Sequence, residues 1–274
     1  MREVIVEVPR ESVEEVLDQL LPIVPGGVRE VQRDGCVELR MRGDRLPETS
    51  DLTRVLSRWA PRLEERTVPD DWRERRVADY EPDIIGGRVV VRPEWAPASL
   101  DQYLIEIVLG ENAAFGAGTH PTTRTCVELL AELAPSGSFA DLGCGTGLLA
   151  IAACRLGWDP VTAVDVQPHS VEATRKNAAA NEVAVTVSAR DLSGEPPPRA
   201  DGVTANVPAW LHVKIAAGLP DPTPKLAIVS GFVPAEANDV LDAYAARGLR
   251  PARQIDAHGW VVAVLVHDLR VEPG

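Results

Sequence analysis

The clearest chemical feature of the sequence is a run of glycines that stands between two acidic residues. Asp141 is followed by glycine at every second position, namely Gly143, Gly145 and Gly147. Glycine lets the backbone turn sharply and approach a ligand closely. The next apolar segment ends in Asp165, and a carboxylate at that place can accept hydrogen bonds from both hydroxyls of a ribose. The spacing therefore predicts a site for an adenosine-containing ligand.

This glycine run departs from the dinucleotide fingerprint. That fingerprint needs a further glycine where Leu148 stands, so NAD is disfavoured as the ligand.

Two of the acidic residues each have a second possible role. Asp165 is also suited to cap the helix that starts at Pro168. Asp191, past the third strand of this region, either reaches the exocyclic amine of an adenine or serves as a turn residue.

The elements that must position these residues alternate between strand and helix, which is typical of a parallel sheet covered on both faces. The expected strands are 138–142, 160–165, 183–188, 201–205, 225–230, 250–256 and 260–267. The expected helices are 121–134, 147–157, 168–181, 208–218 and 234–247. Only three residues, 257–259, separate the last two strands, which is too short for a parallel crossover. We therefore expect the last strand to run antiparallel to its neighbour.

The front of the chain reads as a smaller α+β unit. The expected elements are a strand at 3–8, a helix at 10–21, a hairpin at 28–41, a second helix at 50–60 and a strand at 88–92. Charged residues crowd 62–81, as in a solvated helix or linker. We expect three regions: an N-terminal α+β domain at 1–62, a linker region at 63–103 and the ligand-binding domain at 104–274.

The charge of the chain excludes some partners. Its 28 Lys and Arg residues stand against 41 Asp and Glu residues, which gives a net charge of −13. Such a charge repels phosphate backbones and attracts basic partners, so we expect no direct nucleic-acid binding. The four cysteines form no CxxC pair and the histidines lack ligand spacing, so we expect no metal site.

The hydropathy pattern excludes a membrane span. The longest apolar runs, 148–154 and 260–266, are seven residues each, whereas about 20 are needed to cross a bilayer. The opening Met1-Arg2-Glu3-Val4 lacks the apolar core of a signal peptide. We expect a cytoplasmic protein.

Three segments carry a resemblance to known enzymes. Residues 141–147 (Asp-Leu-Gly-Cys-Gly-Thr-Gly) and 163–165 (Ala-Val-Asp) resemble the S-adenosyl-L-methionine (SAM) site of class I methyltransferases. Residues 115–123 (Phe-Gly-Ala-Gly-Thr-His-Pro-Thr-Thr) resemble the Phe-Gly-Thr-Gly-Thr-His-Pro-Thr-Thr loop of the PrmA family, which methylates ribosomal protein uL11 (L11). Residues 205–209 (Ala-Asn-Val-Pro-Ala) resemble that family's Ala-Asn-Ile-Leu-Ala.

The likeness has a limited extent. It runs from Ile105 to about Asp268 and continues more faintly at 71–74 and 85–88, whereas the N-terminal unit matches by pattern more than by residue. Ala117 replaces the family's usual Thr, and Val207-Pro208 replaces Ile-Leu.

This resemblance implies an α/β fold with a Rossmann-like seven-stranded sheet of order 3-2-1-4-5-7-6. It implies a SAM-dependent N-methyltransferase that acts on the α-amine and lysine amines of uL11, with the front domain recognising that protein. An acidic enzyme suits a basic ribosomal substrate. The resemblance together with the spacing gives these cofactor-binding residues: Phe115, Thr119, His120, Thr123, Asp141, Gly143, Gly145, Gly147, Asp165, Asp191 and Asn206.

Asn206 and Val207 carry the predicted catalytic chemistry. Methyl transfer from a sulfonium is an in-line displacement, so an enzyme mainly has to align a neutral amine lone pair and exclude water. The side-chain carbonyl of Asn206 and the backbone carbonyl of Val207 can accept hydrogen bonds from the amine. A lysine amine needs help to lose its proton, and His120 is the nearest candidate for that help. His120 is equally suited to cap the helix that begins at Pro121.

Two other functions stay open on the sequence alone. The first is the same chemistry on another protein or on a small-molecule amine, because the front domain matches the family weakly. The second is a SAM-binding module without turnover, against which Asn206 and the intact loop at 115–123 argue.

Overall fold

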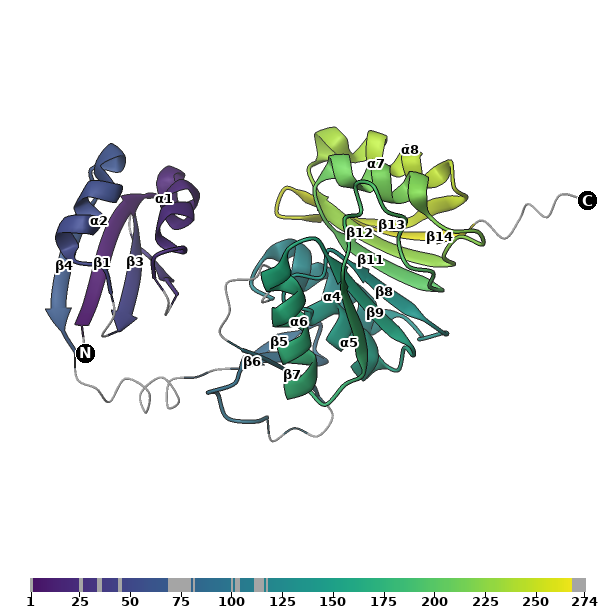
Figure 1. Ribbon diagram of the computed structural model, residues 1–274, viewed down its shortest axis with the longest axis horizontal. Coiled ribbons are helices and arrows are strands. Elements are labelled where there is room, and N and C mark those ends of the chain that lie inside the picture. Colours follow the sequence, from purple (N-terminus) through teal and green to yellow (C-terminus); the bar gives the residue numbers. More distant parts are fainter. Residues whose placement is uncertain are drawn as a thin grey trace, which may run out of the picture. The chain divides into compact units, whose positions relative to one another are not determined.

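The computed structural model describes residues 2–24, 27–33, 36–43, 46–68, 80, 82–99, 101, 104–110, 116 and 118–267. The chain splits into two compact units, Met1–Tyr80 and Glu81–Gly274 (Figure 1). Residues 71–74, Phe115 and Ala117, which entered the resemblance, lie outside the described residues. None of the described helices has the length and hydropathy of a membrane span.

The first unit is built on a four-stranded sheet of order β2-β3-β1-β4. Its elements are β1 (Arg2–Pro9), η1 (Arg10–Ser12), α1 (Val13–Leu20), β2 (Arg29–Gln32), β3 (Cys36–Gly43), α2 (Thr49–Val55), η2 (Ser57–Trp59) and β4 (Arg62–Thr67). Alternate residues of β1, Val4, Val6 and Val8, point into a core to which α1 and α2 add Val16, Leu20 and Leu52.

The other face of β1 holds a buried carboxylate. Glu3 is 0% exposed, and its side chain accepts hydrogen bonds from Arg42 on β3 and Arg66 on β4. Burial alone would raise the pKa of Glu3, but the two guanidinium groups outweigh it and the pKa is lowered. This triad links β1 to both of its neighbours, β3 and β4.

The second unit contains the predicted seven-stranded sheet. Its strands are β8 (Phe139–Leu142), β9 (Val161–Asp165), β10 (Val185–Ala189), β11 (Gly202–Asn206), β12 (Leu226–Phe232), β13 (Leu249–Ala257) and β14 (Trp260–His267). Their order is β10-β9-β8-β11-β12-β14-β13, which confirms the predicted order 3-2-1-4-5-7-6. β14 pairs antiparallel with both β12 and β13, as the short connection at 257–259 predicts.

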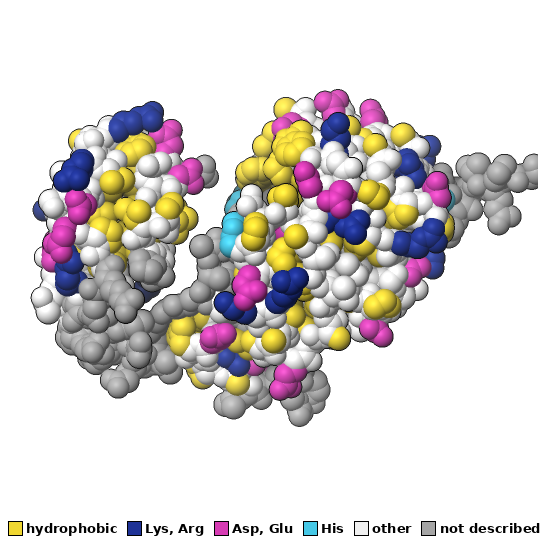
Figure 2. All heavy atoms as spheres, viewed as in Figure 1, with side chains coloured by type: hydrophobic (Ala, Val, Ile, Leu, Met, Phe, Trp, Pro, Cys, Tyr) yellow, Lys and Arg dark blue, Asp and Glu magenta, His cyan; other side chains and the backbone are white. Residues whose placement is uncertain are grey.

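Helices cover both faces of this sheet (Figure 1). They are α4 (Pro121–Glu132), α5 (Leu148–Leu156), α6 (Pro168–Ala180), α7 (Ala209–Gly218), η3 (Pro234–Glu236) and α8 (Ala237–Ala245). One core cluster joins α4 and α5 to the sheet, and another joins α7 and α8 to the opposite face. On the face of the second unit shown in Figure 2, acidic and basic side chains are interspersed.

A smaller sheet extends the second unit. Its order is β5-β6-β7, from β5 (Asp83–Ile85), β6 (Val89–Pro93) and β7 (Ile105–Leu109). Ile85, Val89 and Ile107 pack into the same core cluster as α4 and α5. The second unit therefore starts at Glu81, earlier than the expected 104, and the region 63–103 that we expected as a linker contains most of β4 and all of β5 and β6.

Two buried asparagines, Asn177 of α6 and Asn181 at its C-cap, bind the outer strand of this sheet. The amide of Asn181 pairs with both backbone groups of Val108, at 2.8 Å to the N–H and 2.6 Å to the carbonyl. One turn earlier, Asn177 accepts from the Gly110 N–H at 2.9 Å and donates to the Thr146 carbonyl at 2.8 Å. Asn177 thus links the end of β7 to the glycine-rich loop.

Asp141 is buried at the centre of the large sheet. It is 1% exposed, and its Oδ2 accepts from the Ala150 N–H of α5 at 3.1 Å. Its Oδ1 is buried and has no hydrogen-bond partner among the described residues. Burial raises the pKa of Asp141 to about 7, opposed by the Ala150 hydrogen bond and aided by the charge of Asp165.

We expect Asp141→Asn to remove a pH dependence of stability. The folded pKa of about 7 lies above the ordinary value of 3.8, so the parent protein loses stability as the pH rises through this interval. Above both pKa values, the free energy of unfolding is lower by about 4 kcal/mol than below them. Asparagine keeps an acceptor for Ala150 and carries no charge. Denaturant unfolding of both proteins between pH 4 and pH 8 measures the difference, and parallel stability curves would contradict this prediction.

Candidate functional site

The predicted site residues come from neighbouring parallel strands that end at one edge of the sheet. Asp165 ends β9, Asp141 lies near the end of β8, and Asn206 ends β11. β9, β8 and β11 pair in parallel, so their carboxyl ends meet. The chain reverses its direction of travel across the sheet between β8 and β11, which is where open α/β sheets bind ligands.

A sharp turn carries the glycine-rich loop away from β8. The N–H groups of Gly143 and Cys144 both donate to the Val164 carbonyl, at 2.8 and 3.0 Å. Gly143 has φ +82°, and a Cβ there would lie 2.5 Å from Cγ1 of Val207. Gly147 has φ +81°, and a Cβ there would lie 3.1 Å from Cα of Thr174. Both positions therefore require glycine, for backbone conformation and for space.

Asp165 contacts the loop through its carboxylate. Its Oδ2 accepts from the Gly145 N–H at 3.0 Å, and its Oδ1 accepts from the Gln167 N–H at 2.8 Å. The second bond is an Asx-type turn just before α6, whose N-cap residue is Gln167 without a side-chain cap bond, so Asp165 does not cap this helix. A carboxylate offers about four acceptor positions, so these two bonds leave capacity for a ligand's hydroxyl groups. The side chain is half-buried and thus accessible to a ligand.

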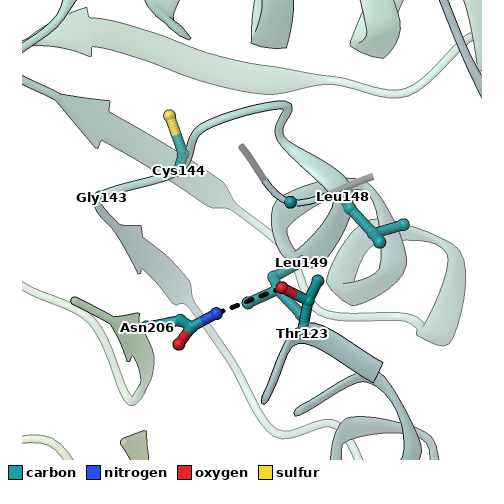
Figure 3. A pocket seen from close by; sticks show the side chains of 7 residues that line it. Thr123, Gly143, Cys144, Leu148, Leu149 and Asn206 are labelled. Carbon is teal, nitrogen blue, oxygen red and sulfur yellow. Dashed lines mark hydrogen bonds between the residues drawn. The ribbon is translucent and has the colours of Figure 1, made fainter. Parts of the chain in front are cut away.

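A pocket lies beside the loop (Figure 3). It is open to solvent, its space of about 250 Å³ includes that open part, and it is lined by Gly116, Thr123, Gly143, Cys144, Leu148, Leu149 and Asn206. Thr123, Gly143 and Asn206 are among the predicted residues. Leu148 and Leu149 were not predicted, although their place directly after Gly147 at the start of α5 was a usable signal. The lining combines apolar surface with a few polar groups, as small-molecule sites do.

Asn206 is held by the first turn of α4. Its Nδ2 donates to Oγ1 of Thr122 at 3.1 Å and to Oγ1 of Thr123 at 3.2 Å (Figure 3 draws the Thr123 bond). His120 precedes the helix, and its Nδ1 accepts from the Thr122 N–H at 3.3 Å, which is the capping contact. The His120 ring also lies edge-on to Trp260, at 5.6 Å between centroids. Thr122 was missed from the sequence.

Val207 is held from the side of β12. Its N–H donates to the Ser230 carbonyl at 3.0 Å, and a Cβ at Gly231 would lie 2.5 Å from the Val207 carbonyl oxygen. His212 supports this arrangement, because its Nε2 donates to the same Ser230 carbonyl at 2.8 Å and its Nδ1 is 3.1 Å from the Tyr244 hydroxyl. Burial lowers the pKa of His212 to about 4, so the ring is neutral. His212 was also missed.

The remaining predicted residues that the structure describes lie outside the pocket lining. Asp191 is exposed in the turn after β10, where its Oδ1 accepts from the Ser193 N–H and hydroxyl, and these bonds lower its pKa. Thr119 is exposed just before α4. Asp141 faces α5 through its bond to Ala150, and Phe115 lies outside the described residues.

The chain is similar to known methyltransferases over most of its length. The family model described as ribosomal protein L11 methyltransferase (PrmA) matches residues 49–268. A relative from Chromohalobacter salexigens, named ribosomal protein L11 methyltransferase, is 34% identical over 227 residues, covering 77% of this chain and 74% of the relative. One of the same name from Geobacter metallireducens is 35% identical over 199 residues, covering 70% of this chain and 64% of the relative.

A solved structure shows the same architecture. The ribosomal protein L11 methylase from Lactobacillus delbrueckii subsp. bulgaricus aligns with a TM-score of 0.59 and 25% identity, over 69% of this chain and 100% of that chain. These matches confirm the predicted methyltransferase fold, the enzyme class and SAM as the cofactor. The chain belongs to the ribosomal protein L11 methyltransferase (PrmA) family.

Proposed function

We propose that this chain methylates ribosomal protein L11, at its α-amine and at lysine amines. The observation that carries the proposal is the amide of Asn206, which lines the pocket beside the glycine-rich loop with its nitrogen bonded to Thr122 and Thr123. The names of the relatives support L11 as the substrate. The net charge of −13 suits a basic ribosomal protein. We further propose a cytoplasmic location, without direct contact with nucleic acid or membrane.

The described residues fit a bound SAM. Asp165 would bind the ribose with its remaining acceptor capacity, and Gly116 and Gly143 line the pocket without side chains. Both described bonds to the Asp191 carboxylate go to Oδ1, which leaves Oδ2 for an adenine amine. When bound, SAM supplies a methyl group on a sulfonium. The contacts proposed for Phe115 and Thr119 rest on the resemblance alone.

Asn206 would align the substrate amine. Because Nδ2 is bonded to two hydroxyls, Oδ1 is the atom left to accept a hydrogen bond from the amine (Figure 3). That bond directs the amine's lone pair and holds the amine near the reacting methyl. Gly231 keeps a side chain away from the Val207 carbonyl, our second proposed acceptor, since a Cβ there would lie 2.5 Å from its oxygen.

We assign recognition of the protein substrate to two surfaces. The first unit, Met1–Tyr80, contains none of the proposed cofactor residues, which leaves its surface for L11. On α7, which starts three residues after Asn206, Trp210 and Val213 stand one turn apart and are 60% and 42% exposed. Exposed aromatic side chains of this kind often supply much of the binding energy at protein interfaces. Binding of a small-molecule amine would not require either surface.

The direct test incubates the purified chain and SAM with purified L11. Intact-mass spectrometry should show mass increments of methyl groups on L11, and peptide mapping should place them on the α-amine and lysines. Release of S-adenosylhomocysteine with a small-molecule amine, but not with L11, would favour the alternative substrate. No release with any acceptor would favour a binding module.

We expect Asp165→Ala to weaken SAM binding by about 2–3 kcal/mol, the scale of hydrogen bonds to a charged acceptor. Titration calorimetry gives the affinity directly. Asp165→Asn is the matched control, because it keeps one acceptor oxygen and should lose less. Since Asp165 also binds the loop at Gly145, thermal unfolding must be compared for both variants. An unchanged affinity for Asp165→Ala would remove Asp165 from the ribose role.

We expect Asn206→Ala to keep SAM affinity nearly intact and to lower turnover by about 100-fold, the cost of lost positioning. Asn206→Asp should be milder, because a carboxylate retains an acceptor oxygen. Its charge should also raise the pKa of the bound amine and shift the rate optimum to higher pH. Single-turnover rates measure both effects. Equal rates for Asn206→Ala and the parent protein would mean that another group aligns the amine.

A further inference from the structure

The hydrogen atoms around Thr122 can be assigned from the contacts of His120. The Thr122 backbone N–H donates to Nδ1 of His120 at 3.3 Å, so this ring nitrogen is an acceptor and carries no proton. The Thr122 hydroxyl lies 2.7 Å from the same Nδ1. Since Nδ1 has no hydrogen to give, the hydroxyl must be the donor in that contact. Thr122 therefore donates to His120 through both its backbone and its side chain.

This assignment determines what Thr122 can do toward Asn206. A hydroxyl has a single hydrogen, so once it donates to His120 its oxygen can only accept. The side-chain atom of Asn206 at 3.1 Å from Oγ1 of Thr122 must then be the amide nitrogen. Thr123 does not determine the orientation of the amide, because its hydroxyl, 3.2 Å from the same Asn206 atom, is able to donate or to accept. The orientation of the Asn206 amide thus depends on His120 through Thr122.

Burial makes this dependence strong. Thr122 is 1% and Thr123 is 2% exposed, so water does not compete for their hydroxyls. The oxygen and nitrogen of an amide have nearly the same shape, and the hydrogen-bond network alone selects between the two orientations. The edge-on contact with Trp260 orients the His120 ring as well.

We propose that His120 is a positioning residue that sets the direction of the Asn206 amide through the hydroxyl of Thr122. This proposal rests on the proposed function, in which Asn206 accepts a hydrogen bond from the substrate amine. In the opposite orientation the Asn206 NH₂ group would face the amine. It would then donate to the lone pair that has to attack the methyl group. The relay from His120 to Thr122 excludes that arrangement.

The test uses four single variants and reads single-turnover methylation of L11 against SAM affinity. Thr122→Val and His120→Ala break the relay, and each should lower the rate by roughly tenfold while leaving the SAM dissociation constant within about twofold. Thr122→Ser keeps the hydroxyl, and His120→Asn keeps an acceptor at the position of Nδ1 and remains a favoured helix cap. Both conservative variants should recover most of the parent rate.

A double-variant cycle separates positioning from a merely structural role. In the Asn206→Ala background, Thr122→Val and His120→Ala should each cause no further loss, because both act through the amide that is already gone. Additive losses, or full activity in Thr122→Val and His120→Ala, would overturn the relay. If Thr122→Val does not fold, the same cycle with His120→Ala decides. Full activity of Asn206→Ala itself would instead overturn the proposed role of Asn206.

Discussion

The site depends on one carbonyl group, that of Val164. It accepts hydrogen bonds from the N–H groups of Gly143 and Cys144, and so binds the start of the glycine-rich loop to the end of the neighbouring strand. The next residue along β9 is Asp165, whose carboxylate then reaches the Gly145 N–H. A shift of this contact would separate the pocket lining from the carboxylate that we assign to the ribose. The position of the cofactor site therefore follows from the pairing of β8 with β9.

The loop is also supported by further hydrogen bonds, most of them to residues outside the pocket lining. Asn177 joins the Thr146 carbonyl to the Gly110 N–H, and the Thr146 hydroxyl donates to the Gly116 carbonyl at 2.8 Å. Asp141 supports the start of α5 through Ala150. These contacts come from α6, β7 and β8, so the loop is constrained by three elements before a ligand binds. Such preorganisation lowers the ordering cost of binding.

Patterns local in the sequence predicted the fold and part of the site. The alternation of strands and helices, with the resemblance, predicted the strand order, and glycine spacing located the loop between Asp141 and Asp165. The sequence did not reveal that Asp141 points into α5, because a buried carboxylate and a ligand-binding one have the same spacing. The contacts of Thr122 with Asn206 and of His212 with Ser230 join distant segments, which periodicity does not report. β5 was not predicted for a different reason: its three residues are too few to show an alternation of apolar and polar side chains.

The pairing of Asn181 with Val108 has a consequence for association between copies of the chain. β7 is the outer strand of its sheet, and an outer strand normally offers unpaired N–H and carbonyl groups to any passing strand. The Asn181 amide occupies both backbone groups of Val108, and Asn177 occupies the next available N–H, at Gly110. Two side chains, one in α6 and one at its C-cap, thus take the place of a neighbouring strand. This part of the edge is closed to strand addition, and hence to edge-to-edge aggregation, without a proline or a lysine.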